Sequence, residues 1–327
     1  MRGFNPGRQA QFDLFGTRSN NSRSNAYFGF GDYTAGYALV QYNRILAFSN
    51  NTESSNTNFS TGAKIPQGFS AFSNYTQRMY ILSGYVNPGL DSNTNYSSIT
   101  SNTQGTISGT WYGVLRRGGC SPAAYFGIRF DTSYSTLWFG GYSDNTGLYY
   151  NRLDALVTST ETGVSGGTNS YTCHVGAGFA NYQKAYFVGG INNGTTVSTI
   201  SYRDWSSGTI ATVAATDVAT SYYSYGVCNW GYGYRFGGQG GGAYNNTLRF
   251  NFYNETSQTG TSLPSSQAQF SGVTSASNVF GYLWTGYRSS TLNRFLNLYS
   301  WSTDTISDNS YSTADPNNGW IMAAAGV

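Results

Sequence analysis

Short apolar runs that end in glycine recur along the chain. One of them, residues 185–190, reads AYFVGG. Similar runs are AYFGFG (26–31), MYILSG (79–84), LWFGG (137–141), YRFGG (234–238) and YLWTG (282–286). Their final glycines, at intervals of about 50 residues, are Gly31, Gly84, Gly141, Gly190, Gly238 and Gly286. Self-similarity at such a period is typical of a chain built from repeated supersecondary units.

Each copy continues in the same order after its glycine. A polar turn comes first, and a strand with alternating apolar and polar residues follows, as in ISYRDW (200–205) and LRFNFY (248–253). A Ser/Thr/Gly-rich strand comes next, and the copy closes with a run of small residues. Those runs are GFSAFSN (68–74), CSPAAYFG (120–127), CHVGAGFA (173–180), YGVCNWG (225–231), FSGVTSAS (270–277) and IMAAAGV (321–327). The pattern predicts four short strands per copy and no helix.

Four-stranded sheets repeated around an axis form a β-propeller, so the repeat predicts an all-β fold of six blades. We expect the small-residue runs to be crowded innermost strands, and Tyr, Phe and Trp on the outer strands to fill the wedges between blades. The glycines that end the second strand of each copy are expected to let the backbone turn with positive φ or approach a neighbour closely. The first copy has no small-residue run before residue 26, whereas the last copy has IMAAAGV left over. We therefore expect this segment to be the inner strand of the first blade and to close the ring.

The chain resembles the kelch family in a glycine pair that ends an aromatic strand and precedes a tyrosine and a tryptophan, as in FVGGINN…SYRDW. The resemblance covers residues 27–327. The intact motif residues are Gly140 with Gly141, Gly189 with Gly190, Gly237 with Gly238, and the tryptophans Trp205 and Trp301. The resemblance implies a six-bladed kelch-like β-propeller with four-stranded blades. It does not imply a kelch-type adaptor role, because propellers support many functions.

Composition and charge limit the classes of partner. Charged residues make up only 9% of the chain, and its apolar residues never approach the roughly 20 consecutive positions of a spanning helix. The net charge is +3, and the first 26 residues hold four arginines against one aspartate. We expect no nucleic-acid partner and no membrane insertion. We divide the chain into an N-terminal basic arm (1–26) and a six-bladed propeller (27–327).

Catalytic chemistry has few candidates in this sequence. His174 is the single histidine, and the three cysteines are Cys120, Cys173 and Cys228; all lie at or beside expected inner strands. A histidine-based metal site or a Ser-His-Asp triad would have to use His174, for which a structural role is the simpler interpretation. We expect no catalytic residue, no metal, no cofactor and no enzymatic activity. A carboxylate pair among the 14 acidic residues stays open, because separation cannot be read from sequence.

The polar turns after the glycines are the candidate binding surface. Turns at the same position in successive blades lie on one face of a propeller, where tyrosine rings and amide groups suit sugar rings and their hydroxyls. The glycan-binding candidates are Tyr33, Tyr37, Tyr85, Tyr142, Tyr149, Asn192, Asn193, Tyr244, Asn245 and Tyr287. Ordinary turn chemistry is the alternative, since Asn and Gly favour turns in any protein.

The composition is similar to that of phage tail-fibre and head-decoration proteins, being rich in Gly, Ser, Thr, Asn and Tyr and poor in lysine. The N-terminus has no apolar segment typical of a secretory signal. We expect a structural virion protein of a bacteriophage, made in the host cytoplasm and present in multiple copies. It would decorate the particle or contact host surface glycans. A secreted carbohydrate-binding lectin and a polysaccharide-degrading enzyme are the alternatives.

The arm is expected to attach the protein to other virion proteins. It combines arginines with a few aromatic residues and buries too little apolar surface to fold alone. The anchoring candidates are Arg2, Arg8, Phe12, Phe15 and Arg18. The alternative is that the arm packs back on the rim of the propeller.

Overall fold

The structure is a computed structural model of the chain. It describes residues 25–32, 41–47, 52–55, 69–73, 78–86, 89–98, 104–107, 115–120, 136–142, 149–157, 162–168, 176–264 with gaps at 182, 193–194, 205–206, 223, 230 and 239–244, then 273–276, 279–285, 295–309 and 319–326. Side chains are described mainly between residues 176 and 307. The described residues are all-β, with no helix among them, and their strands pair in antiparallel sheets.

Most of these strands belong to four-stranded sheets, numbered here from the N-terminus. The first sheet comprises β26 (Gly319–Gly326), β1 (Asn25–Asp32), β2 (Gln41–Ala47) and β3 (Thr52–Ser55). The second comprises β4 (Phe69–Ser73), β5 (Arg78–Val86), β6 (Gly89–Ser98) and β7 (Gln104–Ile107). The third comprises β8 (Leu115–Cys120), β9 (Thr136–Tyr142), β10 (Tyr149–Val157) and β11 (Thr162–Thr168).

The second half of the chain repeats this order. The fourth sheet comprises β12 (Ala177–Ala180), β13 (Lys184–Val188), β16 (Thr199–Asp204) and β17 (Ile210–Thr216). The fifth comprises β18 (Tyr225–Cys228), β19 (Tyr232–Phe236), β20 (Thr247–Asn251) and β21 (Thr256–Gly260). The sixth comprises β22 (Val273–Ala276), β23 (Phe280–Thr285), β24 (Phe295–Ser300) and β25 (Thr305–Asn309). A two-stranded ribbon, β14 (Ile191–Asn192) with β15 (Thr195–Thr196), extends the fourth sheet's central hairpin.

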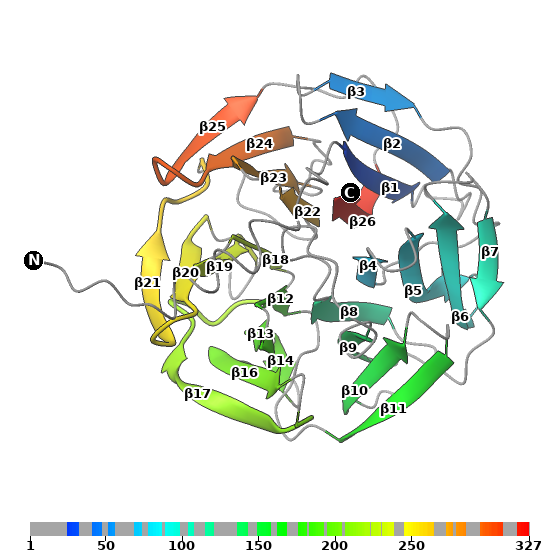
Figure 1. Cartoon of the computed structure of the whole chain (residues 1–327), viewed down its shortest axis with the longest axis horizontal. Helices are drawn as coiled ribbons and strands as arrows, with labels where there is room; N and C mark the ends of the chain where they lie inside the picture. Colours follow the sequence, from blue (N-terminus) through cyan, green and yellow to red (C-terminus); the bar gives the residue numbers. More distant parts are fainter. Residues whose placement is uncertain are drawn as a thin grey trace, which may run out of the picture.

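The sheets succeed one another around a common centre (Figure 1). One edge strand of each sheet lies nearest that centre, and we call it the inner strand. The opposite edge strand lies at the rim. The inner strands are β26, β4, β8, β12, β18 and β22. The first sheet takes its inner strand from the other end of the chain. Strand β26 pairs antiparallel with β1, with Tyr27 opposite Ala325 and Phe28 opposite Ala324. The expected pairing of the C-terminal segment with the first repeat is therefore confirmed.

Close packing explains the small residues on the inner strands. A Cβ atom added to Gly226 of β18 would lie 2.3 Å from the carbonyl oxygen of Gly178 on β12. Only glycine permits such an approach of two backbones. The glycine pairs also behave as expected, because Gly189 and Gly190 have φ of +65° and +101°, a region that side chains disfavour.

The inner strand of the third copy differs from the expected segment. The sequence placed it at residues 120–127, whereas β8 spans Leu115–Cys120 and pairs Gly119 with Phe139. Residues 121–127 lie outside the described part of the chain. Gly118 and Gly119 supply the small residues instead.

Aromatic side chains fill the seams between neighbouring sheets. Between the fourth and fifth sheets, Tyr186 contacts Phe250 with ring centroids 5.0 Å apart, and both belong to one buried cluster. Between the fifth and sixth, Tyr234 and Tyr299 are 4.9 Å apart in a second cluster. These rings come from the second and third strands of their sheets. At these two seams, aromatic residues from strands outside the innermost one therefore fill the space between sheets, as expected.

Candidate functional site: the seam between the fourth and fifth sheets

The glycan-binding candidates divide into two groups. Five of them lie outside the described residues: Tyr33, Tyr37, Asn193, Tyr244 and Tyr287. The same holds for His174 and for the anchoring candidates of the arm, Arg2, Arg8, Phe12, Phe15 and Arg18. Backbone positions are described for Tyr85, Tyr142, Tyr149 and Asn192, and Asn245 is described in full. Asn245 is half-buried just before β20, and its carbonyl accepts the Leu263 N–H at 2.7 Å.

The strands extend further into the expected turns than the sequence suggested. Tyr85 lies within β5, opposite Leu90, and Tyr142 and Tyr149 face each other as the last pair of the β9–β10 hairpin. Asn192 pairs with Thr195 in the two-stranded ribbon. In the second sheet, the ladder shifts register between Leu82 and Gly84 and then resumes. A bulge at this point therefore lets β5 continue past Gly84, where a turn was expected.

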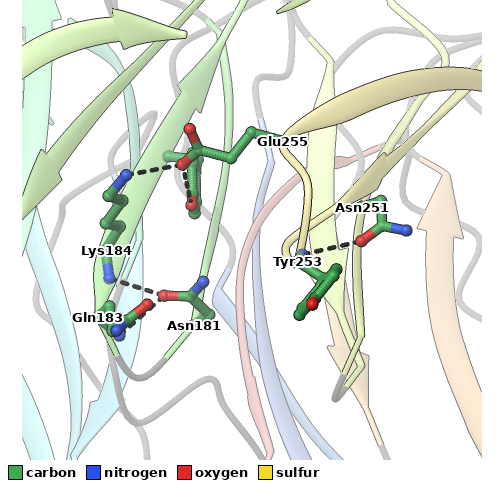
Figure 2. Close-up of polar contacts among 7 residues, drawn as sticks. Asn181, Gln183, Lys184, Asn251, Tyr253 and Glu255 are labelled. Atoms are coloured by element: carbon green, nitrogen blue, oxygen red, sulfur yellow. Dashed lines mark hydrogen bonds and ion pairs between the residues drawn. The ribbon is translucent and has the colours of Figure 1, made fainter. Parts of the chain in front are cut away.

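The opposite ends of the sheets hold a described polar cluster. In a four-stranded antiparallel sheet, the turns from first to second and from third to fourth strand share one end, and the central turn lies at the other. The cluster joins the β12–β13 turn of the fourth sheet to the β20–β21 turn of the fifth (Figure 2). We call this set, Asn181, Gln183, Lys184, Tyr186, Asn251, Tyr253 and Glu255, the seam cluster.

Glu255 accepts two hydrogen bonds across the seam. Its Oε1 atom lies 2.7 Å from Lys184 Nζ and 2.9 Å from the Tyr186 hydroxyl. The Lys184 ammonium also lies 3.9 Å from the ring centroid of Tyr202, a cation–π contact. Burial, followed by the charge of Glu255 and its hydrogen bond, raises the pKa of Tyr186 far above its usual range. The phenol therefore stays a donor at every physiological pH.

Asparagine side chains hold the two turns in shape. Asn181 Oδ1 accepts the N–H groups of Gln183 at 2.8 Å and Lys184 at 2.7 Å. On the other side, Asn251 Oδ1 accepts the N–H of Tyr253 at 2.8 Å. Gln183 and Tyr253 project from these turns into solvent, and Tyr253 is 76% exposed. The turns thus fix the backbone and leave an amide and a phenol ring on the surface.

The β20–β21 turn belongs to a short motif that repeats in every copy. The motif has five positions. The first is apolar or threonine, and the second and third are mostly small and polar. The fourth is Asn, Glu, Gly or Asp, and the fifth is Thr. The six copies are FSNNT (48–52), ITSNT (99–103), TSTET (158–162), WSSGT (205–209), FYNET (252–256) and WSTDT (301–305). Gly208, Glu255 and Asp304 have φ of +70°, +52° and +56°. The fourth position is therefore left-handed in each copy where it is described, a signal that the sequence analysis missed.

The described ion pairs all join neighbouring sheets. Lys184 with Glu255 and Arg235 with Asp217 connect the fourth and fifth sheets, and Arg249 with Asp304 connects the fifth and sixth. Asp304 stands at the motif position of Glu255, so two successive copies use this residue in the same way. Glu255, Asp217 and Asp304 each contact a basic side chain across a seam.

The described residues offer little for metal or membrane chemistry. No group of three or more His, Cys, Asp and Glu side chains among them could hold a metal ion. Nor does that part of the chain contain a helix long and apolar enough to cross a bilayer. Comparison with known proteins identified no relationship: no protein-family model matches the chain, and no curated protein matches its sequence.

Proposed function

We propose that the chain is a closed, six-bladed, kelch-like β-propeller that serves as a non-enzymatic structural protein of a bacteriophage particle. It decorates the particle or contacts the host surface. It uses no cofactor. The observation that carries the proposal is the arrangement of the sheets. Four-stranded sheets surround a common centre, and β26 and β1 unite the two ends of the chain in one sheet. Such a rigid disc presents many turns on two faces.

The use of charge in the described region supports a non-enzymatic role. Acid–base catalysis needs a titratable group directed at a substrate, with a pKa suited to proton transfer. Here Glu255, Asp217 and Asp304 each face a basic side chain of a neighbouring sheet. These carboxylates contribute to the alignment of the sheets.

Attachment to the particle is proposed to use the N-terminal arm. Its arginines would pair with carboxylates of another virion protein, and its aromatic residues would fill apolar pockets. Removal of residues 1–23 is expected to leave a folded, soluble protein that no longer joins particles. Normal incorporation of the shortened chain would refute anchoring by the arm.

Host contact is proposed to use the turns between second and third strands. Tyr142 belongs to the third copy and Tyr244 to the fifth. Replacing both with Ala is expected to reduce host adsorption without lowering the melting temperature. One aromatic stacking contact contributes about 1 kcal/mol, so several copies would be needed for avidity. Unchanged adsorption by the double variant would favour decoration alone.

The particle assignment is tested by labelling. An antibody against the purified chain, used on phage particles prepared from the source culture, should bind at a regular position in electron micrographs. The same purified chain should leave host capsule and lipopolysaccharide at their original length. Polysaccharide cleavage would instead establish the degrading enzyme, and secretion of the protein by uninfected cells would establish the lectin.

A further inference from the structure

Tyr253 departs from the turn motif at a position where every other copy has a small hydroxyl residue. The equivalent residues are Ser49, Thr100, Ser159, Ser206 and Ser302. The other copies therefore serve as an internal control for what the fold requires. Ser302, in the equivalent turn of the sixth sheet, shows that serine is sufficient at this position.

Three contacts of this turn are made by groups other than the Tyr253 ring. Phe252, the preceding residue, packs against the buried cluster between the fourth and fifth sheets. Glu255 bridges to Lys184, and the backbone N–H of Tyr253 is held by Asn251. The Tyr253 residue itself is 76% exposed, the largest exposure among the described exposed large hydrophobic residues. A ring this exposed can contact a ligand, and tyrosine is enriched at binding interfaces.

The surroundings of Tyr253 are polar and nearly neutral. Figure 2 shows its turn beside the β12–β13 turn, which carries Gln183 and Lys184. The charge of Lys184 is matched by Glu255 at 2.7 Å, and 21% and 32% of these side chains are exposed. The exposed amide of Gln183 can both donate and accept hydrogen bonds. No net charge therefore favours a phosphate or a sialic acid at this seam.

We propose that the seam cluster is a binding site for neutral pyranose glycans, with Tyr253 as the stacking platform. The apolar face of a sugar ring would lie on the phenol ring, while Gln183 and Glu255 hydrogen-bond its hydroxyl groups. The site lies at the opposite ends of the sheets from the turns that the sequence suggested. Glycan binding at this site would extend the proposed host contact. Binding is a property of the isolated chain, however, and would occur whether or not the chain belongs to a particle.

The test uses the full-length protein and three probes: maltohexaose, cellohexaose and N-acetylchitohexaose. Saturation-transfer NMR and titration of backbone resonances should detect at least one of them with a dissociation constant of roughly millimolar order. The Tyr253→Ser variant, which installs the residue of the next copy, should bind about five-fold or more weakly. The Tyr253→Phe variant should retain binding because its ring can still stack.

A second variant tests the facing turn. Gly231 occupies the position of Gln183 in the fifth sheet, and the N–H of each is accepted by the asparagine two residues earlier. Gln183→Gly should therefore preserve the fold and weaken binding. Ser302→Ala, in the equivalent turn of the sixth sheet, is the matched control and should leave affinity unchanged. Melting temperatures of all variants should agree with the parent protein.

Several outcomes would overturn the proposal. One is no binding of any probe at about 10 mM. Another is equal affinity of the parent and Tyr253→Ser proteins at equal stability. Sedimentation supplies a third, because a dimer that Tyr253→Ser dissociates would assign the ring to contact between copies. None of these results bears on particle labelling, so failure here and failure of the proposed function are distinguishable.

Discussion

Arg235 Nη2 lies 2.6 Å from Asp217 Oδ1 across the seam between the fourth and fifth sheets, and neither side chain is exposed to solvent. The pair is embedded in further hydrogen bonds. Arg235 Nη1 donates to the Gly237 carbonyl at 2.7 Å, and Ser221 Oγ donates to Asp217 Oδ2 at 3.2 Å. Phe187 and Leu283 stand at the equivalent positions of the neighbouring repeats. The fold therefore accepts an apolar side chain where the fifth sheet has arginine.

Loss of one partner from this pair should be severely destabilising. Asp217→Ala leaves a buried guanidinium without its counter-charge, and we expect a loss of about 3–5 kcal/mol in the free energy of unfolding. The double variant Asp217→Ala with Arg235→Leu should recover most of that loss, because it removes the charge as well. Urea denaturation measures both. The single variant Arg235→Leu completes the comparison. If the double variant loses as much free energy of unfolding as the two single variants added together, the two residues act independently.

A buried amide at the next seam should be replaceable by leucine. Asn297 of β24 is 0% exposed, and neither its Nδ2 nor its Oδ1 has a hydrogen-bond partner among the described residues. Leu248 occupies the equivalent position of β20 and is also fully buried. Because an unsatisfied buried amide costs about 1–3 kcal/mol, Asn297→Leu should raise the melting temperature. Calorimetry tests this, and a lowered melting temperature would indicate that the amide is satisfied in the folded protein.

Alkaline pH should destabilise the fold through its buried tyrosines. Burial raises the pKa of Tyr225, of Tyr186 and of Tyr234 above the ordinary range. An unfolded tyrosine ionises near pH 10, so both states keep the proton below about that pH and stability there is unaffected. At higher pH the unfolded chain releases protons that the folded chain keeps. The free energy of unfolding then falls by up to about 1.4 kcal/mol per pH unit for each such group.

One substitution isolates this effect. Tyr225→Phe removes a hydroxyl that has no hydrogen-bond partner among the described residues, and it should reduce the alkaline slope by about one proton. The parent protein, denatured at the same pH values, is the control. Chemical denaturation at a series of pH values between about 8 and 11 measures the slope. Equal slopes for Tyr225→Phe and the parent protein would contradict the assignment.

Removal of residues 320–327 should prevent stable folding. These residues form most of β26, which pairs with β1 from Ala26 opposite Gly326 to Asp32 opposite Gly319. Without β26, the inner edge of the first sheet would present unpaired N–H and C=O groups and would favour aggregation. The expected result is insoluble protein or a much lower melting temperature. An unchanged melting temperature would contradict a stabilising role for this pairing.

The sequence alone determined the strand content and the order of the strands. The alternation of apolar and polar residues predicted strands, and the recurrent glycine pair predicted left-handed backbone at Gly189 and Gly237, where φ is +65° and +59°. The small residues IMAAAGV at the end of the chain predicted the partner of β1. These features are local properties of the backbone or follow from counting repeats, so a pattern of residue types is sufficient to reveal them.

Only the tertiary structure decided which residues meet across the seams. Lys184 and Glu255 are 71 residues apart, and Arg249 and Asp304 are 55 apart, although each pair joins adjacent sheets through the same type of turn. The fourth position of the turn motif, which Glu255 and Asp304 occupy, is Asn, Glu, Gly or Asp in different copies. No constant residue type therefore marks the position that forms these ion pairs. Which side chains come within hydrogen-bonding distance depends on how neighbouring sheets pack against each other. That packing results from many contacts between residues far apart in the chain, which no short stretch of sequence encodes.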